Sequence, residues 1–224
     1  MIWIGTLSAG INKLNPGSLQ FRTYRNEAGD PGSLPSNHVG AFAETSDGAM
    51  WVGTWENGLA RFDPLTGKFT SYRHDSEDSK SISSDLVMSL LGEPDGSLWV
   101  GTLGSGLNHL DVASGVFTRY QNDPANAASV LDDRITALLI DGEARLWVAS
   151  MAGLSRLDPI AKTFINYPLD APVVDLELIG DTLWIGTWGG GLHRYDPTNQ
   201  RFTRYTPDPR NPDSLSHPLV TDLV

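Results

Sequence analysis

The chain has 224 residues, and its 27 acidic side chains against 16 basic ones give a formal net charge of −11 at pH 7. This balance disfavours binding to nucleic acid or to anionic membrane surfaces, and no basic stripe or polybasic segment offsets it. The absence of cysteine excludes disulfides, thiolate metal sites and a cysteine nucleophile. No apolar run approaches the roughly 18 residues that direct membrane insertion requires.

The chain begins with a short β-rich run, MIWIGT, whose Trp-Ile/Val-Gly-Thr motif returns three more times and once as WVAS. Intervals of 48, 48, 48 and 37 residues separate the five tryptophans, which are Trp3, Trp51, Trp99, Trp147 and Trp184. A Gly-Leu or Gly-Ile pair follows each motif, and a turn then leads into a Phe-x-x-Tyr pair that closes the unit. The closing tyrosines are Tyr24, Tyr72, Tyr120, Tyr167 and Tyr205. Such self-similarity indicates a repeat architecture.

Within a unit the runs have a period of two and are bounded by Gly, Asp and Pro turns, which is typical of strands joined by hairpins. A fourth run precedes each tryptophan from the second unit on, as in HVGAFAE and LVMSLLG. These runs are more uniformly apolar, as expected of a strand buried on both faces. Four antiparallel strands in each radially repeated unit predict an all-β fold of the β-propeller class.

The order within a unit is inner strand, Trp strand, third strand and Phe-x-x-Tyr strand, so the chain begins on a Trp strand and ends on an inner strand. We therefore expect one β-propeller domain over residues 1–224, with five blades, in which residues 219–224 complete the first blade and remove two open sheet edges. The alternative is that both ends are cuts through a longer array.

The pattern DG.LWVGT..GGL.R.DP.TG.FT.Y, best matched by residues 95–111 and 183–205, resembles the two-component regulator propeller repeat. The resemblance covers essentially the whole chain, and unit four departs most from it. It implies the extracytoplasmic, periplasmic sensor of a bacterial membrane-bound regulator, with a histidine kinase or diguanylate cyclase as its output outside this chain. Family arrays are usually longer, often with seven blades.

The regularly repeated tryptophans and the Phe-x-x-Tyr tyrosines are interpreted as blade core. The aromatics that break the pattern are more informative. After the Trp motif stand Leu7, Trp55, Leu103, Met151 and Trp188, at the start of a loop that we expect beside the long polar connections between units. Loops gathered on one face of a rigid scaffold are where binding usually resides. Trp55 and Trp188 are therefore candidates to stack on a sugar ring, with Glu56, Asn57 and Leu103 beside them, and the alternative is extra packing around the channel mouth.

Signals for catalysis are poor, because no nucleophile elbow, P-loop or zincin motif occurs and the five histidines lack metal-ligand spacing. Asp175 and Glu177 lie two apart on the fourth inner run, and Asp175 is aligned with Gly40, Met88 and Thr136 of the other units. The two carboxylates could meet a ligand in the channel, or simply line a solvated wall. We expect no catalytic residue, metal or cofactor.

The leading prediction is a non-catalytic sensory propeller that binds an oligosaccharide on its loop face. One alternative is an interaction scaffold that forms dimers without a small ligand. The less favoured alternative is a polysaccharide lyase or hydrolase. The fold alone does not decide among these classes.

Overall fold

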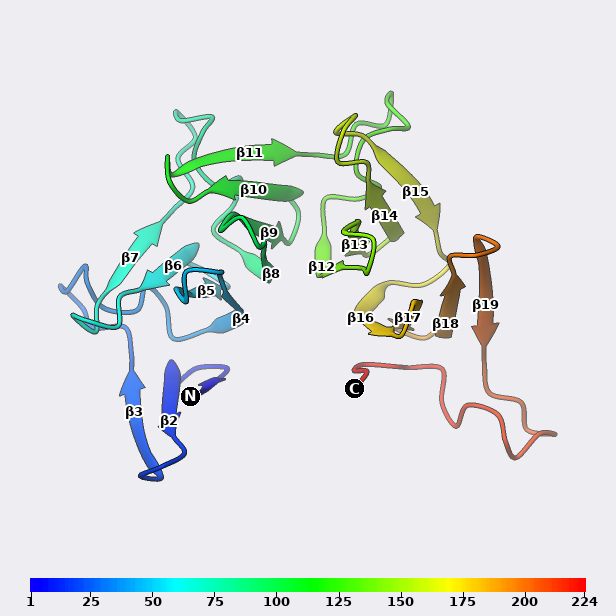
Figure 1. Cartoon of the computed structure of the whole chain (residues 1–224), viewed down its shortest axis with the longest axis horizontal. Coiled ribbons are helices and arrows are strands. Elements are labelled where there is room, and N and C mark those ends of the chain that lie inside the picture. The colour runs from blue at the N-terminus through cyan, green and yellow to red at the C-terminus, as the bar shows by residue number, and fades with distance from the viewer. The chain divides into compact units, whose positions relative to one another are not determined.

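The computed structural model describes all 224 residues. They form nineteen β-strands, joined by turns and connections, and no helix (Figure 1). No helix is therefore available that is long and apolar enough to cross a membrane. The strands form five antiparallel sheets in chain order, and the residues divide into two compact units, Met1–Arg119 and Tyr120–Val224. Each unit is described separately below.

Unit 1 contains three sheets. Sheet 1 has three strands, β1 (Ile2–Gly5), β2 (Ile11–Asn15) and β3 (Gln20–Tyr24). Sheet 2 has β4 (Val39–Glu44), β5 (Met50–Thr54), β6 (Leu59–Phe62) and β7 (Phe69–Tyr72). Sheet 3 has β8 (Val87–Gly92), β9 (Leu98–Thr102), β10 (Leu107–Asp111) and β11 (Val116–Tyr120), whose last residue lies at the unit boundary.

Unit 2 contains two sheets of four strands. Sheet 4 has β12 (Ile135–Ile140), β13 (Leu146–Ser150), β14 (Gly153–Leu157) and β15 (Phe164–Pro168). Sheet 5 has β16 (Val173–Ile179), β17 (Thr182–Thr187), β18 (Gly191–Asp196) and β19 (Arg201–Tyr205). The predicted unit order, with an inner strand before each Trp strand, holds in sheets 2 to 5.

The first strand of each four-stranded sheet carries an irregularity at the same place. The register shifts between Val39 and Ala41 in β4, and at the equivalent points of β8, β12 and β16. One extra residue is left unpaired there, as in a β-bulge, and these residues are Gly40, Met88, Thr136 and Val174. The bulge lies where the inner strand meets the loop after the Trp strand, so it affects the candidate site directly.

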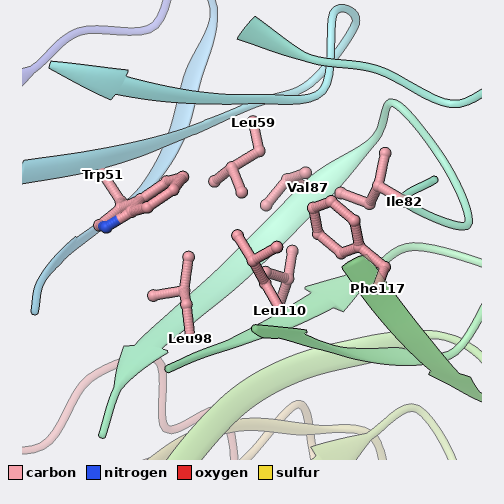
Figure 2. Close-up of a cluster of buried hydrophobic side chains, with 8 residues drawn as sticks. Trp51, Leu59, Ile82, Val87, Leu98, Leu110 and Phe117 are labelled. Carbon is pink, nitrogen blue, oxygen red and sulfur yellow. The ribbon is translucent and has the colours of Figure 1, made fainter. Parts of the chain in front are cut away.

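Sheets 2 and 3 share a core that shows why the tryptophan repeats. Trp51 of β5 points toward Val87, Leu98 and the other apolar residues of sheet 3, and it is fully buried (Figure 2). In unit 2, Trp147 of sheet 4 packs in the same way against Leu183 and Tyr195 of sheet 5. A large aromatic on each Trp strand therefore fills the space between consecutive sheets within a unit.

The other expected core aromatics are buried to different extents. Trp99 and Tyr24 are buried, whereas Trp3 and Trp184 are only half-buried. Tyr72, Tyr120 and Tyr167 are also half-buried. Tyr205 is 39% exposed and stacks on Trp184 with 5.8 Å between the ring centroids, so it caps that tryptophan rather than lying inside a core.

Residues 219–224 form no regular strand, but they dock on sheet 5. The Val220 N–H donates to the Thr187 carbonyl at 3.0 Å, and an isolated bridge joins Leu219 to Trp188. The equivalent bond in unit 1 joins sheet 2 to sheet 1: the Val39 N–H at the start of β4 donates to the Thr6 carbonyl, which follows β1. The C-terminal segment thus contacts sheet 5 as an inner strand contacts the sheet before it. That it completes the three-stranded sheet 1 stays a prediction.

Candidate functional site

The antiparallel sheets give each unit two different sides. The tight turns between the inner and Trp strands lie at one end of the strands, which we call the hairpin side. The loops after the Trp strands lie at the other end, the connection side. There the Trp55 N–H donates to the His38 carbonyl at 3.1 Å, and Leu103 does the same to Leu86. These backbone bonds place the pattern-breaking residues beside the ends of the long connections, as the sequence predicts.

Trp55 lies on the connection side of unit 1, 42% exposed, in a notch made by the bulge glycine of β4. A Cβ atom at Gly40 would lie 2.4 Å from Trp55 Nε1 and 2.6 Å from the Val87 carbonyl oxygen, so only glycine leaves room for this placement of the indole. The ring is therefore fixed by packing while a large part of its surface stays open to solvent. This geometry combines the two interpretations of Trp55, a packed ring and a stacking surface.

The two residues after Trp55 are tied to the connection that precedes β4. Glu56 Oε1 lies 3.1 Å from His38 Nδ1, and the Ser36 hydroxyl donates to Glu56 Oε2 at 3.4 Å. The Asn57 amide donates to the Pro35 carbonyl at 2.9 Å, so this side chain holds the connection in place. His38 and Glu56 remain largely accessible beside the indole. An aromatic face next to a carboxylate and an imidazole is suited to a polar ring-shaped ligand.

Leu103 of sheet 3 is 38% exposed at the position equivalent to Trp55. Unit 1 thus brings together four predicted residues, Trp55, Glu56, Asn57 and Leu103, on its connection side. His38 is a further member that the sequence did not single out, because it is not a pattern-breaking residue of the loop after the Trp strand.

Trp188 and Asp175 belong to unit 2. Trp188 is 59% exposed and bonds through its N–H to the Pro172 carbonyl at 2.8 Å. Asp175 Oδ2 accepts the Leu223 N–H at 2.7 Å, so this carboxylate holds the C-terminal segment. The interpretation of Asp175 as the equivalent of Gly40, Met88 or Thr136 is wrong. The strand register aligns it with Ala41, Ser89 and Ala137, and the equivalent of Gly40, Met88 and Thr136 is the bulge residue Val174.

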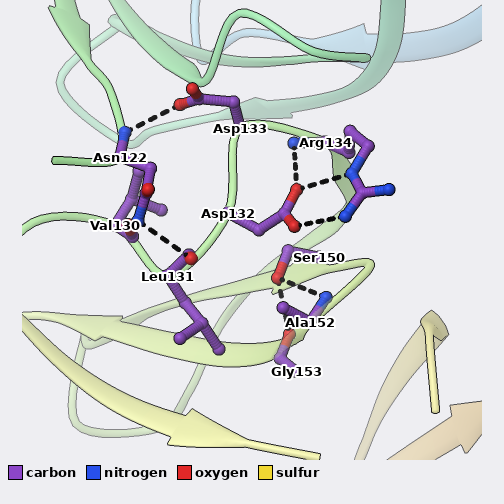
Figure 3. A network of polar contacts seen from close by, with 9 residues as sticks. All are labelled: Asn122, Val130, Leu131, Asp132, Asp133, Arg134, Ser150, Ala152 and Gly153. Atoms are coloured by element: carbon purple, nitrogen blue, oxygen red, sulfur yellow. Dashed lines mark hydrogen bonds and ion pairs between the residues drawn. The ribbon is translucent and has the colours of Figure 1, made fainter. Parts of the chain in front are cut away.

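An ion pair on the connection side of unit 2 adds a fixed cation that the sequence did not indicate. The Arg134 guanidinium donates to both carboxylate oxygens of Asp132, at 2.9 and 2.6 Å (Figure 3). These hydrogen bonds hold the pKa of Asp132 below its usual value, and they raise the pKa of Arg134. In the same network Asp133 accepts the Asn122 N–H at 2.7 Å, which anchors the connection.

The hairpin side of unit 1 carries a second polar cluster that sequence reasoning missed. His109 Nε2 lies 2.9 Å from both Glu93 Oε2 and Ser97 Oγ, and its ring lies 4.2 Å from the Trp99 ring. The hydrogen bond to His109 lowers the pKa of Glu93. His109 faces a hollow of about 710 Å³ together with Asp47, Asp95 and Asp111. The strand register shows that His109 stands where Lys13, Arg61, Arg156 and Arg194 stand in the other sheets.

No group of three or more His, Asp or Glu side chains is arranged to hold a metal ion. The register also aligns His193 with Asn108, so neither His193 nor His109 belongs to a repeated histidine position.

Residues 33–56 match the family model described as two component regulator propeller. Over this segment the chain is similar to the two component regulator propeller repeat. This segment spans β4 and β5 and contains His38, Gly40, Trp55 and Glu56, so the matched repeat and the connection-side cluster of unit 1 coincide. The predicted resemblance is confirmed. No curated protein sequence matches the chain.

Solved structures support the β-propeller class. The chain is similar to an extracellular domain assigned to the hybrid two component system BT3049 of B. thetaiotaomicron, with a TM-score of 0.80 and 23% identity. A second such domain, from the hybrid two component system BT4673 of the same organism, has a TM-score of 0.76 and 20% identity. Each of these two alignments covers 98% of this chain and 28% of the other chain. The chain is also similar to virginiamycin B lyase from Staphylococcus aureus, with a TM-score of 0.69 and 16% identity. This alignment covers 92% of the chain and 67% of the lyase. The two-component propeller repeat thus lies on a fold of this class.

Proposed function

We propose that this chain is part of the extracytoplasmic sensor of a bacterial signal-transduction regulator, and that it binds a saccharide on the connection side of unit 1 without catalysis. The chain spans about 28% of the extracellular domains that it resembles, so the kinase or cyclase output would lie in other parts of a longer protein. The similarity to extracellular domains of two component systems and the matched repeat support the signalling role and the extracytoplasmic location.

The observation that carries the saccharide proposal is the exposed, rigidly held indole of Trp55. A sugar presents one apolar face, formed by its C–H groups, and a rim of hydroxyls. The indole offers a flat surface for that face, while Glu56 and His38 offer an acceptor and a titratable partner for hydroxyls. Because Gly40 and the bulge preset the ring, little side-chain entropy is lost on binding.

The test is a thermal-shift screen of the chain against neutral oligosaccharides, followed by titration calorimetry of any hit. Trp55→Ala should abolish the shift, and Glu56→Gln should weaken binding by about tenfold, the loss typical of one hydrogen bond to a charged group. Trp188→Ala measures separately whether unit 2 contributes. Leu65→Ala, which changes a 95% exposed residue on the hairpin side, is the matched control and should bind as the wild type does.

A ligand at one hundred times its dissociation constant stabilises the folded state by about 2.7 kcal/mol. A chain that melts cooperatively but gains no stability from any saccharide would contradict the proposal. If the molecular mass in solution then rises with protein concentration, the result would favour the interaction scaffold. Turnover of a polysaccharide would instead favour an enzyme.

A further inference from the structure

A polar groove lies at the outer edge of unit 1, away from the Trp55 cluster. It has a volume of about 270 Å³, and it is bordered by the end of β3, by the connection after β3, and by the turn between β6 and β7. Three cationic side chains line it, Arg22, Arg25 and Lys68. We propose that this groove binds an oxyanion, namely a phosphate, sulfate or carboxylate group.

Two glycines make the room that these cations occupy. A Cβ atom at Gly67, where φ is +72°, would lie 3.0 Å from Arg22 Nη2. A Cβ atom at Gly32 would lie 2.9 Å from Lys68 Cδ. The Arg22 guanidinium also lies over the Tyr24 ring, 5.1 Å from its centroid. The positions of Arg22 and Lys68 are therefore defined by the groove itself, which lowers the entropy lost when they bind a ligand.

The structure pairs none of the three cations with a carboxylate, although Glu27 and Asp30 also line the groove. Asp30 Oδ1 instead accepts the Gly32 N–H at 2.8 Å. Three positive charges thus border one groove without an ion-pair partner, in a chain whose net charge is −11. An arginine fork can bind an oxyanion through two parallel hydrogen bonds, and a lysine adds a point charge.

The repeat itself does not require these cations. The position of Arg22 in the Phe-x-x-Tyr run is held in the other sheets by Thr70, Thr118, Ile165 and Thr203. The position of Lys68 is held by Gln20 in sheet 1, Val116 in sheet 3, Thr163 in sheet 4 and Arg201 in sheet 5, so three of the other four sheets have an uncharged residue there. The same outer strand forms with uncharged residues, so a structural role does not explain why Arg22 and Lys68 stand together here.

The volume also suits a small group. A hollow of about 270 Å³ is large enough for one small oxyanion. The oxyanion could be free in solution or carried on a sugar, and both sources share the recognition chemistry.

The experiment is titration calorimetry of the chain at low ionic strength with inorganic phosphate and with glucuronate, using glucose as the neutral counterpart of glucuronate. We expect phosphate, glucuronate or both to bind, and glucose to give no signal at this site. Arg22→Gln and Lys68→Gln should each weaken binding by about tenfold. The matched control is Lys80→Gln, which removes an exposed lysine outside the groove and should leave binding unchanged.

Binding of phosphate alone would assign the groove to a free anion, and binding of glucuronate alone to a carboxylate on a sugar. Either result supports the proposal if both glutamine variants lose it and raising the salt concentration weakens it. No binding by the wild type, or equal binding by the Arg22→Gln, Lys68→Gln double variant, would overturn it. Trp55→Ala should not change anion binding, so the groove and the proposed saccharide site are tested independently.

Discussion

At the scale of single residues, the repeat tolerates exceptions where a side chain finds new partners. The position held by His193 on β18 is held by Asn108 on β10, and both side chains are buried. Asn108 is satisfied there, because its amide bonds to Ser83 at 2.9 Å. In sheet 5 the partner differs, because the His193 imidazole has a hydrogen bond with the Gly190 backbone. Burial, together with the charge of Arg204, lowers its pKa below the ordinary value of 6.5.

A pH dependence follows from His193. Since its pKa is lower in the folded than in the unfolded chain, the unfolded chain takes up the proton first as the pH falls below about 6.5. Stability should therefore fall as the pH decreases from 7.5 to 5.5, before the carboxylates titrate. His193→Asn should remove this part of the dependence. Calorimetric melting of both proteins across that range checks it, and parallel melting curves would contradict the assignment.

At the scale of elements, the close packing of consecutive sheets is set by glycine in the Trp motif. A Cβ atom at Gly53 on β5 would lie 2.5 Å from Val87 Cγ1 on β8. Sheet 4 has Ala149 at the equivalent position, where it is fully buried, so the backbone itself accepts a side chain there. In sheet 2 the atom nearest to the added Cβ is Val87 Cγ1, whereas in sheet 4 Ala149 packs in one core with Val173, the equivalent of Val87, so the two pairs of sheets differ in spacing at this point.

Gly53→Ala should lower the free energy of unfolding by about 1–3 kcal/mol, the usual cost of overpacking a core. Val87→Ala opens the space that the new methyl group needs. The double variant should therefore be more stable than the sum of the two single losses predicts. Urea unfolding of all four proteins gives the coupling energy, and simple additivity would show that the two residues do not compete for the same space.

The Trp motifs, the inner strands and the hairpin turns could all be predicted because each follows from a local pattern. The bulges could not. A bulge shifts the register by one residue without a sequence signal of its own. Asp175 was misaligned for a different reason: Val173 and Val174 both fit the first apolar position of the inner strand, and only the register shows that Val173 holds it. The partners of Glu56 and Asn57 also lie in a separate segment, residues 35–38, whose approach depends on the folded connection.

At the scale of the whole molecule, the sequence predicts that residues 219–224 supply the missing strand of sheet 1. Sheet 1 has three strands, whereas every other sheet has four. The segment carries the inner-strand pattern, with Val220 in the place of Val87. Its backbone contacts with Thr187 and Trp188 of sheet 5 match those of an inner strand with the sheet before it.

Deletion of residues 219–224 tests the prediction. If the segment pairs with β1, the amide protons of Ile2–Gly5 should lose protection from hydrogen exchange in the deletion variant. Loss of the Leu223 bond to Asp175 should also weaken sheet 5. Unchanged exchange in β1, with the effect confined to sheet 5, would contradict closure through this segment.

The central claim is that Trp55 forms the face on which a saccharide stacks. The most direct measurement is the NMR signal of each tryptophan indole N–H during titration with an oligosaccharide, with the signals assigned by single Trp→Phe variants. The account predicts that the Trp55 signal shifts with a saturable dependence on ligand, while the signals of the buried Trp51 and Trp147 stay in place. Saturable binding that leaves the Trp55 signal unmoved would contradict it.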